Sequence, residues 1–481
     1  MHLVVLQHGV RGAPINTKYL TNLLSERLGN TGFVYNFSGN VKVSDALLIC
    51  DSPPLATSFY ERMSWGPLNQ QFATYDGIDI CGERLFQGVK SAHDNLVHQG
   101  TPPTHISFIG YCLGGLIARY VAGRLFSEGY FDHVTPLNFI TIATPHLGSW
   151  RQPTSAMHCP MKLPSPEALS RTGAQLYLRD ATPWGPPLLC VLSHPGLNFM
   201  AALRTFKNIV TMANVRYDRT VTFCSAAMQL EEPYPLRDFE RAVAVVDPAY
   251  PSIIRPRTSA EDSGEPSPDR RPLRGRFLLI LLILMAVILF PLVLLMPLLS
   301  MLHGRLHSRR KTTAAGNSVL QNLYTSWGGG VSGGSVKQRP PFHGPDVPPG
   351  RPRTVDVENG LMVRVGASSN DSCYGGGTVL VTSGFVSGGA GTKGGPEDRV
   401  PLHKDHLRQQ QQLFAGLPPA SDKSGLQAWL VAQLATLPVR KVHVDTCNVL
   451  HAHSAIIVSN RLFLHCRDAM QYLVDQCMVW P

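Results

Sequence analysis

The chain has 481 residues, of which 44% are hydrophobic and 16% are charged, so it can bury a core of roughly 250 to 300 residues. Its formal net charge of +10 would suit a nucleic-acid partner, but the sequence has no recognised binding module and no basic strip interleaved with aromatic residues. We therefore exclude nucleic-acid binding. The ten cysteines are irregularly spaced and no signal peptide precedes the first apolar run, so we expect free thiols in a reducing, cytosolic setting.

The first predicted strand is an apolar run at residues 3–7, which is followed by His8 and Gly9. A backbone N–H directly after such a strand can donate a hydrogen bond to a developing oxyanion, and Val10 occupies that place. By itself this pattern also describes an ordinary glycine turn after a buried strand. The next motif favours the catalytic interpretation.

A second predicted strand turns sharply into a helix within residues 106–120. Cys112 lies on the turn between Gly110 and Gly114, which is the G-x-S-x-G pattern of a nucleophile elbow with cysteine at its apex. A helix N-terminus and a neighbouring imidazole both favour a thiolate in such a place, and the N–H of Leu113 would be the second oxyanion donor. The alternative is a small buried cysteine in a fold that has lost its activity.

A third predicted strand, residues 208–215, is followed by Asp218 on a loop. A carboxylate at the carboxyl end of a strand is well placed to orient a catalytic histidine, so Asp218 is the candidate acid. The other interpretation of Asp218 is an exposed ion pair with a neighbouring arginine. Asp247 is a weaker candidate for the same role.

The candidate base lies near the end of the chain. His453 stands just before a β-prone run at residues 454–458, where we expect a strand, and His451 is the reserve. The chain order of nucleophile, acid and histidine is that of α/β-hydrolases. The same region gathers four residues that could bind zinc, although their spacing matches no common zinc module: His443, Cys447, His451 and His453. We found no glycine loop that could cradle a phosphate, and we expect neither a cofactor nor a metal.

In this order the motifs resemble the putative serine esterase family of lipase-like α/β-hydrolases, which includes fungal lipases associated with membranes and lipid droplets. The resemblance extends over residues 1–245 and 425–481 and includes blocks at 75–85 and 138–148. It implies an α/β-hydrolase fold, with a mostly parallel central sheet flanked by helices. It also implies hydrolysis of acyl esters by a triad, here with Cys112 in place of the nucleophilic serine.

The residues from 277 to 302 are apolar apart from one serine and two prolines, and basic residues flank them on both sides. Such a run can span ~30 Å of hydrocarbon, and its flanks suit anionic lipid headgroups. A single crossing would separate the histidine from the nucleophile, which precedes the run. Pro291 and Pro297 permit a hairpin that enters and leaves on one face, and a lid packed on the hydrolase is the remaining alternative. We expect association with the cytosolic face of a membrane, such as the endoplasmic reticulum, or with a lipid droplet.

The predicted organisation is a hydrolase interrupted by two additions. Its parts are a first core segment at 1–255 with a cap at about 150–204, a basic proline-rich linker at 256–276, the hydrophobic segment at 277–302, a flexible low-complexity insertion at 303–420, and a second core segment at 421–481. The second core segment begins with a predicted helix at 426–434 and a strand at 440–444.

The sequence thus predicts a lipase or esterase that acts on lipid acyl esters, including phospholipids, at a membrane or lipid-droplet surface. Two alternatives follow from the cysteine at position 112. One is a catalytically inactive hydrolase fold that serves as a lipid-surface or scaffold protein. The other is a cysteine acyltransferase, which shares the first chemical step and passes the acyl group to an acceptor other than water.

Overall fold

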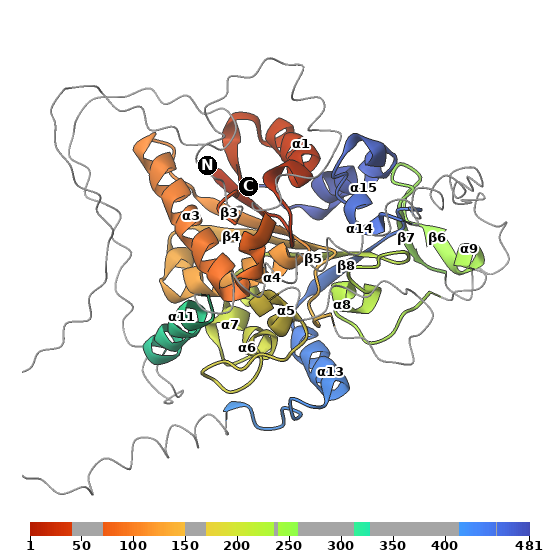
Figure 1. Ribbon diagram of the computed structural model, residues 1–481. Helices are drawn as coiled ribbons and strands as arrows, with labels where there is room; N and C mark the ends of the chain where they lie inside the picture. The colour runs from red at the N-terminus through yellow and green to blue at the C-terminus, as the bar shows by residue number, and fades with distance from the viewer. Residues whose placement is uncertain (41–70, 150–169, 235–238, 258–311, 328–412, 449) are drawn as a thin grey trace, which may run out of the picture.

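The computed structural model describes residues 1–40, 71–149, 170–234, 239–257, 312–327, 413–448 and 450–481 (Figure 1). The hydrophobic segment predicted at 277–302 lies outside these residues, as does almost all of the predicted linker at 256–276. In the part of the chain that is described, no helix combines the length and the apolar character needed to cross a membrane.

The described chain is built on an eight-stranded sheet with the order β2-β1-β3-β4-β5-β8-β7-β6. The first six strands in this order run parallel: β2 (Gly32–Asn36), β1 (His2–Gln7), β3 (His105–Tyr111), β4 (Thr135–Ile142), β5 (Asn208–Asn214) and β8 (Val439–Val444). At one edge, β7 (Ile253–Pro256) is antiparallel to β8, and β6 (Val243–Val245) is antiparallel to β7. The sequence correctly predicted a mostly parallel sheet.

The strand β1 shows why these sequences form buried strands. All six of its residues are buried. Leu3 and Val5 pack into the apolar core on one face of the sheet, whereas Val4 and Leu6 pack into the core on the other face. A strand that is covered on both faces has a continuous apolar sequence and not an alternating one. This pattern is the one from which β1, β3 and β5 were predicted.

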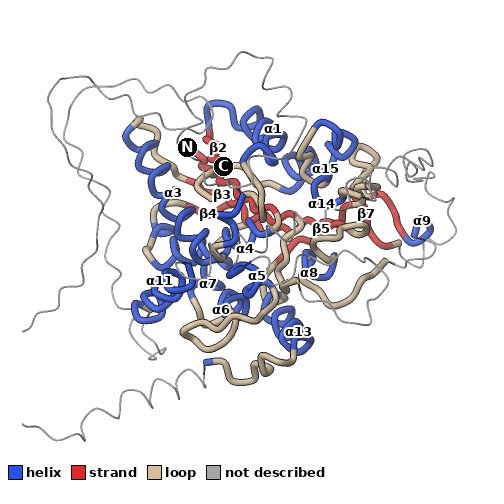
Figure 2. Tube along the Cα trace, viewed as in Figure 1, coloured by secondary structure: helices blue, strands red, loops and turns tan. Residues whose placement is uncertain are grey.

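Helices cover both faces of the sheet (Figure 2). The core that contains Leu3 is closed by α3 (Ile78–His98), α4 (Leu113–Ser127), α5 (Ser170–Leu176), α6 (Leu188–Ser193), α7 (Asn198–Thr205), α11 (Thr312–Ser326) and α13 (Lys423–Leu434). The core that contains Val4 is closed by α1 (Lys18–Leu28), α8 (Phe223–Ala227), α9 (Phe239–Ala242), α14 (Ala452–Ala455) and α15 (Arg467–Tyr472). The parallel strands are therefore shielded from water on both sides.

The C-terminal part of the chain completes the same sheet, because β8 lies between β5 and β7. The helix α13 precedes β8, and its Gln427 side chain donates a hydrogen bond of 3.0 Å to the carbonyl of Leu147 in the loop after β4. The predicted helix at 426–434 and strand at 440–444 are confirmed as α13 and β8.

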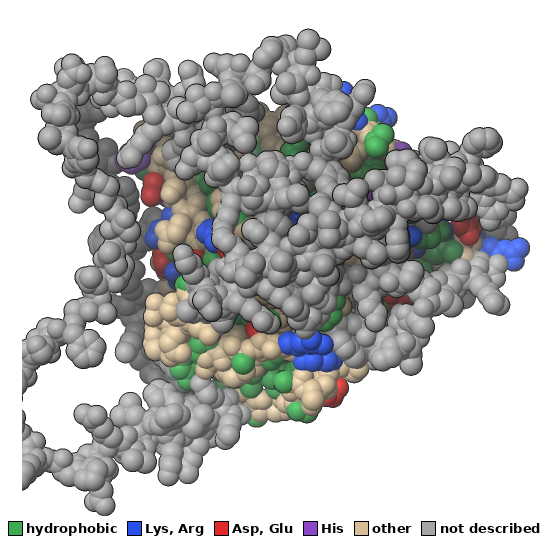
Figure 3. Space-filling model, in the orientation of Figure 1, with side chains coloured by type: hydrophobic (Ala, Val, Ile, Leu, Met, Phe, Trp, Pro, Cys, Tyr) green, Lys and Arg blue, Asp and Glu red, His purple; other side chains and the backbone are tan. Residues whose placement is uncertain are grey.

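The surface of the described residues is mixed in character. On the face that Figure 3 shows, the lysine and arginine side chains of these residues form small separate groups, with polar and hydrophobic atoms between them. The net charge of +10 is thus not gathered into one strip on the visible described surface of this face.

The prediction of a strand at residues 454–458 is wrong. The short helix α14 ends at Ala455, residues 456–458 form a turn, and Val458 has a positive φ of 53°. Ile456 and Ile457 are fully buried in the core that contains Val4. The apolar run therefore reflects burial of a helical turn, which a short sequence does not distinguish from burial of a strand.

The first part of the cap predicted at about 150–204, residues 150–169, lies outside the described residues, and the remainder contains α5, α6 and most of α7. Phe199 of α7 is fully buried against α4, where a side chain at Gly123 would overlap its ring. The helices α6 and α7 are therefore part of the layer that covers the sheet. Their leucine-rich sequence serves this packing.

The insertion predicted to be flexible at 303–420 contains the helix α11, which packs against α3. Leu320, Leu323 and Tyr324 are buried, and their spacing places them on one side of the helix. The ring of Tyr324 meets that of Trp184 edge to face, with 5.5 Å between the centroids. The glycine-rich and proline-rich composition of the whole insertion concealed this short apolar stripe.

Candidate active site

Cys112 lies at the turn between β3 and α4, and its backbone is left-handed, with a φ of 54° and a ψ of −126°. Such a conformation is strained for a residue with a side chain. The turn can close because Gly110 and Gly114 have no side chains. A Cβ atom at Gly110 would overlap the backbone of Gly115, and one at Gly114 would overlap the carbonyl of Gln7. The predicted strand-to-helix elbow is present, with the thiol at the N-terminus of a 15-residue helix.

The loop after β1 lies directly against Cys112. A Cβ atom at Gly9 would be 2.5 Å from the Cβ and 3.1 Å from the Sγ of Cys112. The loop is held by a hydrogen bond from the Gly12 N–H to the Gly9 carbonyl (3.1 Å) and by one from the Arg11 N–H to Thr74 Oγ1 (3.0 Å). Val10 lies within this loop, and Leu113 is the first residue of α4, so both predicted donors belong to segments that adjoin Cys112.

Asp218 follows β5, at the carboxyl end of the sheet, and its side chain is 3% exposed. Its two oxygens accept hydrogen bonds from the His453 ring Nδ1 (2.8 Å), the Asn214 amide (2.9 Å), and the backbone N–H groups of Thr220 and Val221 (both 2.9 Å). Burial by itself raises the pKa of Asp218, but the charge of His453 and these hydrogen bonds together hold it below its ordinary value. The carboxylate is thus charged and fixed.

His453 lies on α14 and is oriented from two sides. Its Nδ1 is bonded to Asp218, and its backbone carbonyl accepts a hydrogen bond of 2.9 Å from the hydroxyl of Tyr111, the residue before the elbow. The rings of Tyr111 and His453 lie 5.0 Å apart. The Nε2 atom of His453 is buried and has no hydrogen-bond partner in the described structure.

The electrostatic surroundings of His453 favour the imidazolium. Burial lowers the pKa of this histidine, but the Asp218 carboxylate and, after it, Cys112 raise the pKa well above its ordinary value of 6.5. Tyr111, whose ring lies 5.0 Å from that of His453, is the residue directly before Cys112. The structure therefore brings Cys112, Asp218 and His453 together from three distant parts of the chain.

The reserve candidates lie elsewhere. Asp247 accepts a hydrogen bond from the Ala249 N–H in the turn between β6 and β7. His451 is exposed, and its ring lies 5.9 Å from that of Phe463. His443 is hydrogen bonded to the Tyr234 hydroxyl at 2.6 Å.

Cys447 contacts the Asp445 carboxylate at 3.4 Å. Within the described residues, no group of three or more histidine, cysteine or acidic side chains is arranged to hold a metal ion, so His443, Cys447, His451 and His453 do not form one site there.

The sequence did not single out two supporting residues. Tyr111 holds the backbone of α14, and the Asn214 amide bridges Asp218 and the carbonyl of Ala452, at 2.9 and 3.3 Å. The available signal was position, because each stands at the carboxyl end of the strand that leads to a site residue. Chemically, the arrangement offers a thiol, an oriented imidazole, and backbone N–H groups from the loop after β1 and from the N-terminus of α4, which together suit acyl transfer.

The fold and the site define an α/β protein with an elbow cysteine beside an Asp–His pair. Residues 62–229 match the family model described as “Putative serine esterase (DUF676)”. The family resemblance drawn from the motifs is therefore confirmed for this part of the chain, which contains the elbow and Asp218.

Curated proteins similar to the chain include “Putative lipase ROG1” of Saccharomyces cerevisiae, 31% identical over 158 residues, and “Putative lipase C4A8.10” of Schizosaccharomyces pombe, 30% identical over 132 residues. The matches cover 32% and 26% of this chain, and 22% and 16% of the relatives. The chain thus matches about a fifth of the length of these proteins.

Among solved structures, the product of the gene lin2722 of Listeria innocua is 12% identical and aligns with a TM-score of 0.25. The alignment covers 48% of this chain and 80% of the other. At this TM-score we draw no conclusion from the likeness.

Proposed function

We propose that the protein is an α/β-hydrolase that cleaves lipid acyl esters, with Cys112 as nucleophile, His453 as general base and Asp218 as the acid that orients it. The topology supports this fold, because the three residues follow the parallel strands β3, β5 and β8. They come in the chain order of nucleophile, acid and histidine, which is that of α/β-hydrolases.

One observation carries the proposal. The hydrogen bond of 2.8 Å from His453 Nδ1 to Asp218 fixes the imidazole and leaves Nε2 buried and without a hydrogen-bond partner in the described structure, on a ring that lies 5.0 Å from that of Tyr111, the residue before the elbow cysteine. A base that is oriented by a third group and lies beside a nucleophile is the arrangement by which hydrolases activate a weak nucleophile.

In the proposed reaction the Cys112 thiolate attacks the ester carbonyl carbon and forms a C–S bond, while the carbonyl electrons move to oxygen. The N–H groups of Val10 and Leu113 stabilise this oxyanion. When the C–O bond breaks, the alcohol leaves with the proton from Nε2 of His453. The imidazole then takes a proton from water, whose oxygen attacks the thioester. Cleavage of the C–S bond releases the fatty acid and restores the thiolate and the imidazolium.

The lipid part of the proposal is supported by the relatives, whose names describe them as lipases, and by the apolar sequence at 277–302. We propose that this segment holds the enzyme at the cytosolic face of a membrane or on a lipid droplet. The catalytic residues by themselves specify only acyl transfer.

The direct test is the reactivity of Cys112 toward iodoacetamide at neutral pH, with the labelled residues identified by mass spectrometry. Cys112 should react much faster than Cys224, which is partly exposed and whose pKa burial raises to about 12. The substitution His453→Ala should remove this difference, whereas His451→Ala on the same loop should retain it. Equal labelling of Cys112 and Cys224 in the unaltered protein would contradict the proposal.

Hydrolysis of a soluble short-chain ester provides the second test. His453→Ala should reduce kcat by several orders of magnitude, because triad members act as a unit, whereas His451→Ala should leave it nearly unchanged. Loss of activity in His451→Ala alone would transfer the role of base to that residue.

The burial of Cys112, which is 5% exposed, favours a second candidate, a non-catalytic lipid-surface protein. An inert Cys112 in the labelling experiment would support it. A cysteine acyltransferase would give a third result, in which Cys112 forms the thioester but releases it only after an alcohol or amine acceptor is added.

A further inference from the structure

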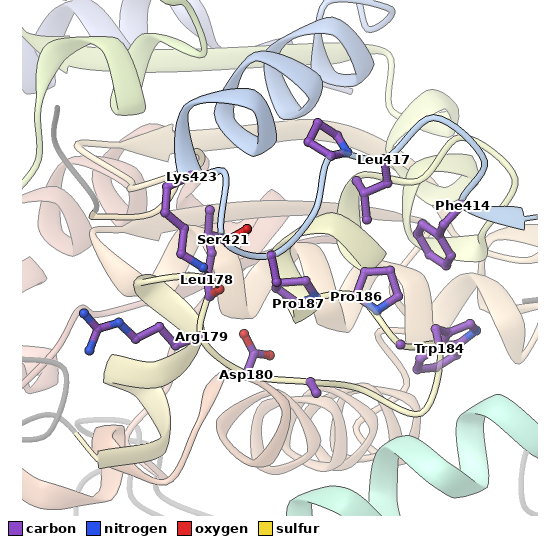
Figure 4. Close-up of a pocket in the computed structure, with 14 residues that line it drawn as sticks. Leu178, Arg179, Asp180, Trp184, Pro186, Pro187, Phe414, Leu417, Ser421 and Lys423 are labelled. Atoms are coloured by element: carbon purple, nitrogen blue, oxygen red, sulfur yellow. Dashed lines mark hydrogen bonds between the residues drawn. The ribbon is translucent and has the colours of Figure 1, made fainter. Parts of the chain in front are cut away.

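A cavity of about 780 Å³ lies apart from the proposed catalytic residues, none of which lines it. Its walls come from the loop between α5 and α6 and from the segment that leads into α13 (Figure 4). A volume of this size is typical of sites for small ligands, which commonly need a few hundred to about 1,000 Å³.

The two ends of the cavity differ in chemistry. Figure 4 shows Arg179, Asp180, Ser421 and Lys423 toward one end. The other end is formed by apolar and aromatic side chains, mainly Trp184, Pro186, Phe414 and Leu417. The cavity therefore suits an amphiphile, with a polar head at the first end and a hydrocarbon chain at the second.

Asp180 has an unused acceptor. Its Oδ2 accepts a hydrogen bond of 2.9 Å from the Leu188 N–H at the start of α6, whereas its Oδ1 is buried and has no partner in the described structure. Burial raises the pKa of Asp180 to about 6. A buried acceptor without a partner costs free energy, and a ligand that donates a hydrogen bond to Oδ1 would recover it.

Lys423 brings the opposite charge to the same end. Its ammonium donates a hydrogen bond of 2.5 Å to the carbonyl of Leu178. Burial and then the charge of Arg179, which also lines the cavity, lower the pKa of Lys423, whereas Asp180 raises it. An anionic head group would meet the Asp180 carboxylate, and a cationic one would meet Lys423 and Arg179. A hydroxyl avoids both repulsions, because it can donate to Asp180 and accept from Lys423.

We propose that this cavity binds a neutral single-chain amphiphile whose head group carries hydroxyls, such as a glycerol monoester or monoether. The proposal does not depend on the proposed hydrolase activity, because none of its residues belongs to the catalytic set.

The test measures binding calorimetrically on the full chain carrying Cys112→Ala, which prevents turnover. The ligands are 1-O-decylglycerol, decanoate, decylamine and 1-decanol, which share one chain length and are used below their critical micelle concentrations. We expect 1-O-decylglycerol to bind at least about tenfold more tightly than the two charged ligands, a difference of roughly 1.4 kcal/mol. It should also bind more tightly than 1-decanol, which has only one hydroxyl.

Two substitutions in the cavity, and a control substitution on α1, test where the ligand binds. Ala181→Trp adds a large side chain to the exposed wall of the cavity and should weaken binding about tenfold or more, whereas Ser25→Trp on α1 should not. Asp180→Asn removes the negative charge and should raise the affinity for decanoate, a change of selectivity that loss of structure would not produce. Equal affinity for all four ligands, or binding unaffected by Ala181→Trp, would overturn the proposal.

Discussion

The chemistry of the proposed site depends on where one proton resides between Asp218, His453 and Cys112. The buried carboxylate raises the pKa of His453 above 6.5, so the imidazolium persists to a higher pH than in a free histidine. A thiol can give its proton to this imidazole and remain as a thiolate beside the imidazolium. A serine hydroxyl is a much weaker acid and reacts only while a neutral imidazole is ready to take its proton.

This difference predicts the behaviour of Cys112→Ser. The variant should retain or increase ester hydrolysis, because the base and the oxyanion donors are unchanged. Its kcat/KM should fall as the pH decreases through the pKa of His453, which the Asp218 carboxylate raises, because protonation removes the base. The unaltered protein should stay active to lower pH. The measurement is kcat/KM on a soluble ester between about pH 5 and about pH 9.

The matched control for this profile is Cys112→Ser combined with His451→Ala, which should keep the same acid limb because His451 does not contact Asp218. An acid limb that stays at the same pH when Asp218→Asn is added to Cys112→Ser would show that the carboxylate does not raise the pKa of His453. Complete loss of activity would show instead that the site has become specialised for sulfur.

At the scale of elements, the local sequence was sufficient to predict the structure where the backbone geometry requires a particular residue type. Gly110 and Gly114 are needed because a side chain at either position would overlap the neighbouring backbone, so the elbow could be predicted from its glycines. Asp218 was predicted from its place after a strand, and His453 from the chain order of nucleophile, acid and histidine, although the strand expected after His453 is absent. The support from Tyr111 and Asn214 depends on tertiary contacts, and sequence alone did not indicate it.

Tertiary packing also explains the errors. The residues around Ile457 have the composition of a strand, but the core buries them as part of a helical turn. The helix α11 was not predicted, because its apolar stripe is short and lies within a long polar and glycine-rich region. Burial against α3 stabilises it, and intrinsic helix propensity does little.

The packing of α11 predicts a local effect of Leu320→Ala. Leu320 is 1% exposed, and a buried leucine replaced by alanine commonly costs about 2 to 5 kcal/mol. Because α11 contacts the rest of the described protein mainly through this face, we expect the helix to open locally, with faster amide hydrogen exchange over 312–326. The exposed neighbour Gln321→Ala is the control and should change little. Identical exchange in the two variants would show that Leu320 does not hold the helix.

At the scale of the whole molecule, two separate parts of the chain build one sheet. β8 pairs with β5 and β7, which belong to the first part, and the loop after β8 leads to His453. Both parts must therefore lie on the same side of any membrane that the intervening chain contacts. A histidine within roughly 3 Å of the reacting atoms cannot be separated from its nucleophile by ~30 Å of hydrocarbon.

We predict that residues 277–302, which lie outside the described structure, hold the protein at a membrane from one side only. A tag at the N-terminus and a tag after Lys311 should be equally accessible to protease in sealed membranes, and a luminal protein should stay protected as the control. Deletion of 277–302 should move the protein to the soluble fraction and leave hydrolysis of a soluble ester largely intact, because the sheet and the site are formed by other residues. Opposite protection of the two tags would contradict the one-sided arrangement, and loss of activity in a folded deletion variant would identify the segment as a lid.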